Sequence, residues 1–176
     1  MSRPQGLKVI VGGPCRTGKT VISNFLSDTA GHMNFPDRYE KTAGVRVLEF
    51  ERSVGGGYGS QISVELWDCS GDEKYESCYP AMTQDASAAI LVFDPDDRGQ
   101  SEVMHKWYEW FVDGPGLRAE NCLLIAMRQS KSVMTKPSAP RQIPDRVKMV
   151  SASFESGEVL KREFDRFVKE VESARR

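Results

Sequence analysis

The chain has 176 residues, of which 24 are basic and 25 acidic, so its formal net charge at pH 7 is −1. This length favours one domain, residues 1–176, with a real core, and the balanced charge argues against nucleic-acid binding. No apolar run is long enough to cross a bilayer, and we expect no secretory leader or lipid anchor, because residue 2 is Ser2 and no cysteine lies near the C-terminus. The four cysteines lack zinc spacing and fit a reduced protein of the cytoplasm.

The first predicted strand, residues 7–12, leads into a glycine-rich segment and then a helix. The segment reads G-x-x-x-x-G-K-[ST], the phosphate-binding P-loop pattern, in the strand–loop–helix context that the motif requires. Its backbone amides and the helix N-terminus form an anion site. We expect Lys19 to contact the terminal phosphates of a nucleotide and the Thr20 hydroxyl to bind Mg²⁺. The candidate phosphate-binding residues are Gly13, Pro14, Cys15, Arg16, Thr17, Gly18, Lys19 and Thr20.

A hairpin is predicted after a long polar loop over residues 27–40. Apolar residues alternate from Val45 to Phe50, as in an edge strand, and again over residues 61–67, with a turn over Gly55–Gly59 between the two strands. The second strand ends in the pattern D-x-x-G. Asp68 is expected to hold Mg²⁺ through water, and the amide of Gly71 to bond the terminal phosphate.

The rest of the chain alternates strands and helices. The predicted elements are a central strand over 86–93, a helix that ends at Gly114, a buried strand over 122–127, a polar loop over 128–144, a short strand over 147–150 and a final helix around Phe164. This order predicts an α/β fold: a mostly parallel sheet with helices on both faces and the ligand at the strand C-termini. The P-loop, Asp68 and Ser151 then converge at one edge of the sheet.

Several phrases resemble Rab-type small GTPases. The run W-D-T-A-G-Q-E-R-F of that family resembles residues 67–75, WDCSGDEKY. Its T-I-G-V segment resembles Thr42-Ala43-Gly44-Val45, and its base-contacting S-A-K turn is similar to Ser151-Ala152-Ser153. The resemblance implies a small-GTPase-like P-loop fold with a six-stranded sheet, parallel except for one antiparallel edge strand. It also implies that Thr42 completes the Mg²⁺ shell with Thr20 and Asp68, and that the ligand is GTP or GDP.

Other phrases resemble the Rab-like small-GTPase subunits of the intraflagellar transport B complex. They include GVRVLEFE over residues 44–51, ELWDC over 65–69 and KYESCYPA over 74–81. This resemblance implies docking on the coiled-coil core subunits of that complex. It also implies a location in the cytoplasm, at the basal body and in the cilium or flagellum.

Two positions depart from the small-GTPase pattern. Where that family carries a glutamine that orients the attacking water, this chain has Asp72, whose shorter carboxylate accepts hydrogen bonds but donates none. The expected activity is therefore slow GTP hydrolysis at most. The base-reading motif N-K-x-D is replaced by Met127-Arg128-Gln129-Ser130, so Arg128 can still stack on a purine while the preference for guanine over adenine stays open.

The P-loop is also unusual, because Pro14 removes one amide and Arg16 adds a charge. Arg16 either points to solvent, which we favour, or acts as an arginine finger from within the same chain. Met104 and Tyr108 on the predicted helix belong either to the core or to a partner surface. Tyr79 is either an exposed aromatic for partner recognition or part of a short helix that ends near Pro80.

These observations predict a GTP- or GDP-binding subunit of the intraflagellar transport machinery that acts mainly as a binding module. One alternative is a structural subunit that no longer needs nucleotide. The other is a P-loop kinase, whose only candidate lid is the loop over 128–144. It ranks last because the run Trp67-Asp68-x-x-Gly71 argues against it.

Overall fold

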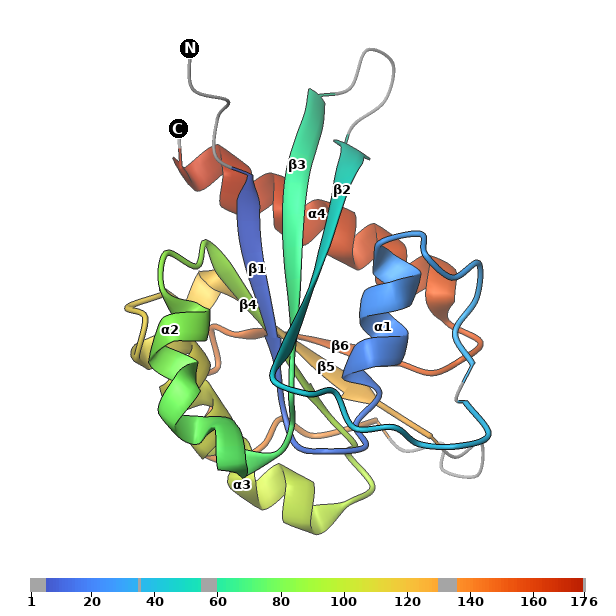
Figure 1. Cartoon of the computed structure of the whole chain (residues 1–176), viewed down its shortest axis with the longest axis vertical. Coiled ribbons are helices and arrows are strands. Elements are labelled where there is room, and N and C mark those ends of the chain that lie inside the picture. Colours follow the sequence, from blue (N-terminus) through green and yellow to red (C-terminus); the bar gives the residue numbers. More distant parts are fainter. Residues whose placement is uncertain (1–5, 35, 55–59, 130–135, 176) are drawn as a thin grey trace.

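A six-stranded sheet with the strand order β2-β3-β1-β4-β5-β6 forms the centre of the computed structural model, which describes residues 6–34, 36–54, 60–129 and 136–175 (Figure 1). The predicted turn over Gly55–Gly59 and the predicted base-site residue Ser130 lie outside these residues. The strands are β1 (Leu7–Gly12), β2 (Val45–Val54), β3 (Ser60–Cys69), β4 (Ala88–Phe93), β5 (Cys122–Met127) and β6 (Lys148–Ala152). The α-helices are α1 (Lys19–Leu26), α2 (Tyr79–Thr83), α3 (Arg98–Tyr108) and α4 (Gly157–Arg175).

Three short helical segments complete the described elements. A 3₁₀ segment over Glu73–Cys78 precedes α2, a π-helical turn over Glu109–Asp113 continues α3, and a 3₁₀ turn over Ala119–Asn121 precedes β5. No helix in the described part of the chain is both long enough and apolar enough to cross a membrane.

Helices cover both faces of the sheet, as predicted. The strands β4 and β5 are buried along their whole length, since each lies inside the sheet between two neighbours and under helices on both sides. One core lies between the sheet and the helices α1 and α4, and the other lies between the sheet and the helices α2 and α3 (Figure 1).

The strand β2 forms one edge of the sheet and pairs antiparallel with β3, whereas every other described pairing is parallel. This arrangement confirms the predicted antiparallel edge strand. Both strands of the hairpin are ten residues long, which is longer than the alternating patterns suggested.

The register of the parallel strands places the predicted site residues at one edge. Val11 lies opposite Asp68, and Met127 lies opposite Ala152. The P-loop, the end of β3 and the end of β6 therefore leave the sheet on the same side, where open α/β sheets bind ligands.

The region around α2 corrects one prediction. Pro80 does not end a short helix there; it lies in the first turn of α2, where its missing N–H has no helical partner to lose. Tyr79 is buried against Trp107, Trp110 and Phe111, and Met104 and Tyr108 are buried as well. These aromatic and methionine side chains thus form core rather than a partner surface.

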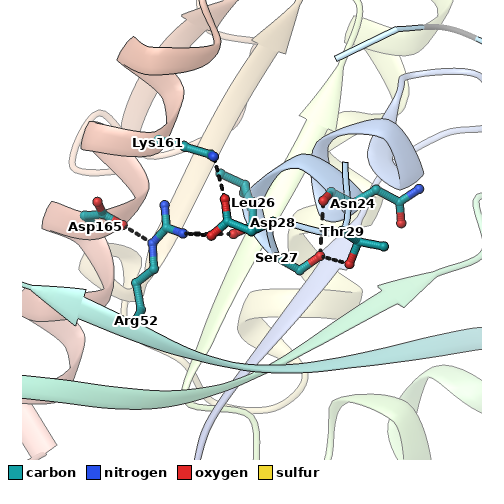
Figure 2. A network of polar contacts seen from close by, with 8 residues as sticks. All are labelled: Asn24, Leu26, Ser27, Asp28, Thr29, Arg52, Lys161 and Asp165. Carbon is teal, nitrogen blue, oxygen red and sulfur yellow. Dashed lines mark hydrogen bonds and ion pairs between the residues drawn. The ribbon is translucent and has the colours of Figure 1, made fainter. Parts of the chain in front are cut away.

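A network of hydrogen bonds and ion pairs between charged side chains links the end of α1 to β2 and α4 (Figure 2). The side chain of Arg52 on β2 is 10 % exposed; its Nε lies 2.6 Å from Oδ1 of Asp165 and its Nη1 2.7 Å from Oδ2 of Asp28. Lys161 donates to the other oxygen of Asp28 at 2.5 Å. Hydrogen bonding from Lys161 and the nearby Arg52 charge lower the pKa of Asp28. This network fixes the point from which the loop after α1 starts.

Replacing Arg52 by methionine is expected to lower the free energy of unfolding by about 2 kcal/mol, because charged hydrogen bonds to two carboxylates are lost while the aliphatic volume is kept. Urea unfolding followed by circular dichroism measures the change. The matched control is Arg146→Met, since Arg146 is 82 % exposed and lies 3.9 Å from Glu120; we expect a change of less than about 0.5 kcal/mol there. Equal losses in the two variants would contradict a structural role for the network.

Candidate phosphate and metal site

The P-loop between β1 and α1 takes a path that its sequence dictates. Gly13 has φ 136° and Gly18 has φ 90°, values that glycine adopts without the steric penalty of a side chain. Arg16 also has a positive φ, 64°, in the left-handed region. These turns carry the chain around a concave loop that opens toward the C-terminal edge of the sheet, beside the N-terminus of α1.

Lys19 is buried under this loop, with 6 % of its surface exposed. Its Nζ donates to the carbonyl oxygen of Pro14 at 2.6 Å and lies 3.5 Å from the Thr17 hydroxyl. Burial lowers the pKa of Lys19 from 10.5 to about 8, against the opposing effect of the Asp68 carboxylate. A positive charge with so little solvation favours an anion as its next neighbour.

This lowered pKa gives a signed prediction for stability. Between pH 8 and 10.5 the unfolded chain holds a proton on Lys19 that the folded chain has released, so the free energy of unfolding rises as the pH rises through this window. We expect the wild type to gain about 1–2 kcal/mol relative to Lys19→Met between pH 7 and pH 9.5. Urea unfolding of both proteins at the two pH values measures it. A constant difference between them would contradict the buried, proton-releasing lysine.

Three oxygen-bearing side chains meet beside Lys19. The Thr20 hydroxyl donates to Oδ2 of Asp68 at 2.8 Å and lies 3.0 Å from the Thr42 hydroxyl. Because the single proton of Thr20 goes to Asp68, Thr42 is the donor in the second bond. The structure thus brings together the three residues predicted to hold the metal, although they come from α1, the loop before β2, and β3.

This trio fits a Mg²⁺ ion. Hydroxyl and carboxylate oxygens are the ligands that Mg²⁺ takes in proteins, together with water and phosphate. Oδ1 of Asp68 is buried and has no hydrogen-bond partner among the described residues, so one carboxylate oxygen is available to a metal-bound water. No three His, Cys, Asp or Glu side chains gather in the described part of the chain, which leaves this mixed set as the metal candidate.

Arg46 is a neighbour of the trio that sequence reasoning missed. Its Nε lies 3.4 Å from Oδ2 of Asp68, and its Nη2 donates to the side-chain oxygen of Asn24 at 2.7 Å. Burial raises the pKa of Asp68, while the Thr20 hydroxyl and the Arg46 charge oppose that rise. Arg46 therefore balances part of the buried negative charge of Asp68.

Two loops, residues 41–44 before β2 and residues 70–72 after β3, lie beside the site and contact each other. The amide of Ser70 donates to the carbonyl oxygen of Gly44 at 2.7 Å, and Lys41 lies 3.2 Å from the Asp72 carboxylate. Gly71 approaches the P-loop so closely that an added Cβ would lie 2.6 Å from the Cys15 nitrogen. Gly71 therefore lies against the P-loop, and the bond from its amide to a terminal phosphate stays a prediction.

A cavity of about 650 Å³ lies between the P-loop, the N-terminus of α1 and residues 36–43. Its walls carry five cationic side chains and one carboxylate, which suits a polyphosphate. The charged residues are Arg16, Lys19, Arg38, Lys41, Arg46 and Glu40. The volume is within the range of small-molecule sites.

Arg16 is exposed, as we favoured, and its guanidinium lies 5.0 Å from the centre of the Tyr39 ring. The contact orders Tyr39 of the loop before β2 against the P-loop. Such a contact is an ordinary cation–π interaction at a partly exposed position, and it holds Arg16 within the wall of the cavity.

The predicted base-side residues lie next to each other at the ends of β5 and β6. The Arg128 amide donates to the carbonyl oxygen of Ala152 at 2.9 Å, and the Arg128 Nε lies 3.4 Å from Oδ2 of Asp96. Ser151 and Ala152 are the last residues of β6 rather than part of the turn after it. Ser153 begins that turn, with its amide bonded to the hydroxyl of Ser156.

A second missed residue joins the base side to the phosphate side. The Gln129 side-chain amide donates to the carbonyl oxygen of Arg16, which connects the segment after β5 to the P-loop. Gln129 occupies the unspecified position of the segment that replaces N-K-x-D, and no role was assigned to Arg46, so their contacts are revealed only where separate loops meet at the sheet edge.

Comparisons with known proteins agree with this geometry. The family described as "Ras of Complex, Roc, domain of DAPkinase" matches residues 8–129. The Homo sapiens protein "Intraflagellar transport protein 22 homolog" is 36 % identical over 168 residues, covering 93 % of this chain and 89 % of that protein. The Danio rerio homolog is 37 % identical over 169 residues, covering 94 % and 89 %.

Among solved structures, the "T. brucei IFT22/74/81 GTP-bound crystal structure" has a TM-score of 0.78 and 26 % identity, covering 98 % of each chain. The "T. brucei IFT22 GDP-bound crystal structure" has a TM-score of 0.72 and 24 % identity, covering 98 % of this chain and 100 % of that one, and this likeness concerns the fold. The P-loop, the hydroxyl–carboxylate trio and these relatives together show that the chain belongs to the intraflagellar transport protein 22 family of Rab-like small GTPases.

Proposed function

We propose that this chain binds GTP or GDP with Mg²⁺ in the 650 Å³ cavity and serves as a nucleotide-binding subunit of the intraflagellar transport B complex. The observation that carries the proposal is that the Thr20 hydroxyl lies 2.8 Å from Asp68 and 3.0 Å from the Thr42 hydroxyl, beside the buried Lys19. Lys19 and the P-loop amides would hold the phosphates. The trio would hold Mg²⁺, which when bound neutralises phosphate charge.

On the base side, we propose that Arg128 stacks on the purine and that Ser151, Ala152 and Ser153 contact its edge. Their position at the ends of β5 and β6, bonded through the Arg128 amide, supports this role. A related protein has been crystallised with GTP. Because Met127 cannot make the polar contacts of an asparagine, base affinity is expected to be weaker than in small GTPases with the full motif.

Hydrolysis is proposed to be slow, because Asp72 is engaged elsewhere. Its carboxylate accepts from the Lys74 amide and pairs with Lys41, and these contacts lower its pKa. A short, ionised side chain held in this way neither donates to a water nor reaches one as a glutamine would.

Replacing Asp72 by glutamine is expected to raise single-turnover GTP hydrolysis about tenfold, a modest contribution for orienting one reactant. Phosphate release from pre-loaded protein, measured with and without Mg²⁺, gives the rate. Asp72→Asn is the matched control, because it removes the charge without adding length. Equal rates in Asp72→Gln and the wild type would contradict the assigned cause of slow turnover.

We further propose that the chain docks on coiled-coil core subunits of the complex and is found in the cytoplasm, at the basal body and in the cilium or flagellum. The related T. brucei protein was crystallised in an assembly described as IFT22/74/81, which supports docking on other transport subunits.

The first experiment is to purify the protein without added nucleotide, denature it and identify what is released by chromatography. The emptied protein is then titrated with GTP, GDP and ATP in the presence of Mg²⁺. Guanine nucleotide in the extract, or tighter binding of GTP than ATP, supports the proposal. If the emptied protein binds none of the three nucleotides, the proposal is overturned in favour of a nucleotide-independent structural subunit. Two features favour this alternative: the loss of the N-K-x-D motif and the proline in the P-loop.

A further inference from the structure

A second cavity, of about 760 Å³, lies outside the phosphate site. One wall is the first two turns of α3, and the other is the polar segment over residues 136–142. Arg128, at the end of β5, forms part of its floor. In the described part of the chain, residues 136–144 contain no helix or strand, so the side of α3 that faces this segment is left open.

The lining is basic, although the whole chain has a net charge of −1. Four Arg or Lys side chains face it against two carboxylates, those of Asp96 and Glu102. Asp96 is already paired with Arg128 at 3.4 Å. Arg98, Lys136 and Arg141 are exposed and form no ion pair with any residue that the structure describes.

Arg98 stands at an unfavourable position for a cation. It is the first residue of α3, where the partial positive charge of the helix disfavours a cation; the N-cap carboxylate of Asp97, which accepts from the Gln100 amide, offsets part of that charge. An anion in the cavity would be attracted by both the helix end and Arg98.

The spread of the cations indicates the shape of that ligand. Arg98 lies in the first turn of α3, Arg128 lies at the end of β5, and Lys136 and Arg141 lie on the opposite wall. A compact phosphate needs donors that converge on one point, whereas these cations come from three separate segments of the chain. No Phe, Tyr or Trp side chain lines the cavity.

We propose that this basic cavity binds an extended acidic peptide segment of a protein partner. The cavity shares Arg128 with the proposed base site but contains no residue of the P-loop or of the phosphate cavity. The proposal goes beyond nucleotide binding, and its test variants leave Arg128 unchanged.

The test uses the full-length protein and fluorescein-labelled octaglutamate as the probe, with fluorescence anisotropy as the readout at low and at physiological salt. We expect binding that weakens as salt is added. The double variant Arg98→Glu/Arg141→Glu is expected to lower the affinity about tenfold. The matched control, Lys106→Glu/Lys169→Glu, changes the charge equally at exposed positions outside the cavity and should change the affinity less than about twofold.

Two further arms locate the probe and identify its chemistry. In the first, carbodiimide should couple octaglutamate to Lys136, and peptide mass spectrometry identifies the coupled lysine. In the second, Lys19→Ala should bind octaglutamate as tightly as the wild type, because the phosphate cavity is a different site. The proposal would be overturned if octaglutamate did not bind, if it coupled only to other lysines, or if the two double variants lost affinity equally. Tighter binding of tripolyphosphate than of octaglutamate at this cavity would also overturn it, in favour of a compact phosphate ligand.

Discussion

Replacing Gly13 by alanine is expected to lower the free energy of unfolding by about 4 kcal/mol, the combined effect of backbone strain and overpacking. Gly13 has φ 136°, and a Cβ built on it would lie 2.1 Å from the carbonyl oxygen of Val92. That oxygen belongs to β4 inside the sheet, so it cannot move aside without disturbing the neighbouring strands. For a chain of this size the midpoint temperature should fall by about 8–16 °C.

The control for this variant is Gly31→Ala. Gly31 has no atom within 4 Å of its added Cβ and is not among the glycines with positive φ, so its replacement should change the free energy of unfolding by less than about 0.5 kcal/mol. Urea unfolding and thermal melts of both variants decide the question. If Gly13→Ala unfolded at the same urea concentration as Gly31→Ala, the close approach of the P-loop to β4 would be refuted.

Replacing Lys19 by alanine is expected to weaken Mg²⁺–GTP binding about 100-fold, which corresponds to the loss of one strong charge-assisted hydrogen bond. Isothermal titration of the emptied protein measures the affinity. The variant should remain folded at pH 7, because it removes a buried charge whose solvation is poor rather than a partner of the core. Its circular dichroism spectrum and melting temperature check this.

Lys106→Ala serves as the control for Lys19→Ala, since Lys106 is exposed on α3 and remote from the P-loop. Unchanged GTP affinity in Lys19→Ala would mean that phosphate is held by other groups. The same variant separates the two functional alternatives: if GTP binding is lost while docking on the transport subunits persists, the chain acts as a structural subunit whatever nucleotide it carries.

Much of the fold was predictable because its signals are local. The strands β1, β4 and β5 are continuous apolar runs between turn residues, and the hairpin strands alternate with period two, so type and order followed from pattern. Pro80 was misread because a proline is compatible with either the end or the first turn of a helix. Tyr79 and Tyr108 were ambiguous for a similar reason: burial depends on which helix covers them.

The candidate site was predictable as far as its motifs extend. The P-loop and D-x-x-G spacings, together with the rule that parallel strands end at one edge, are enough to place Lys19, Thr20 and Asp68 together from the sequence alone. The contacts of Arg46, Lys41 and Gln129 could not be predicted in the same way, because each joins two segments whose relative positions depend on the folded sheet.

The edge position of β2 has a consequence for self-association. A ten-residue strand with a neighbour on one side only leaves a row of backbone N–H and C=O groups open to another sheet. Glu49 and Glu51 are exposed along this strand, and Glu49 lies directly opposite Glu65 of β3, a like-charge pair that weakens the hairpin slightly. We attribute its presence to protection: carboxylates on an open edge repel a second copy of the same edge, so that the hairpin is less stable but does not nucleate aggregates.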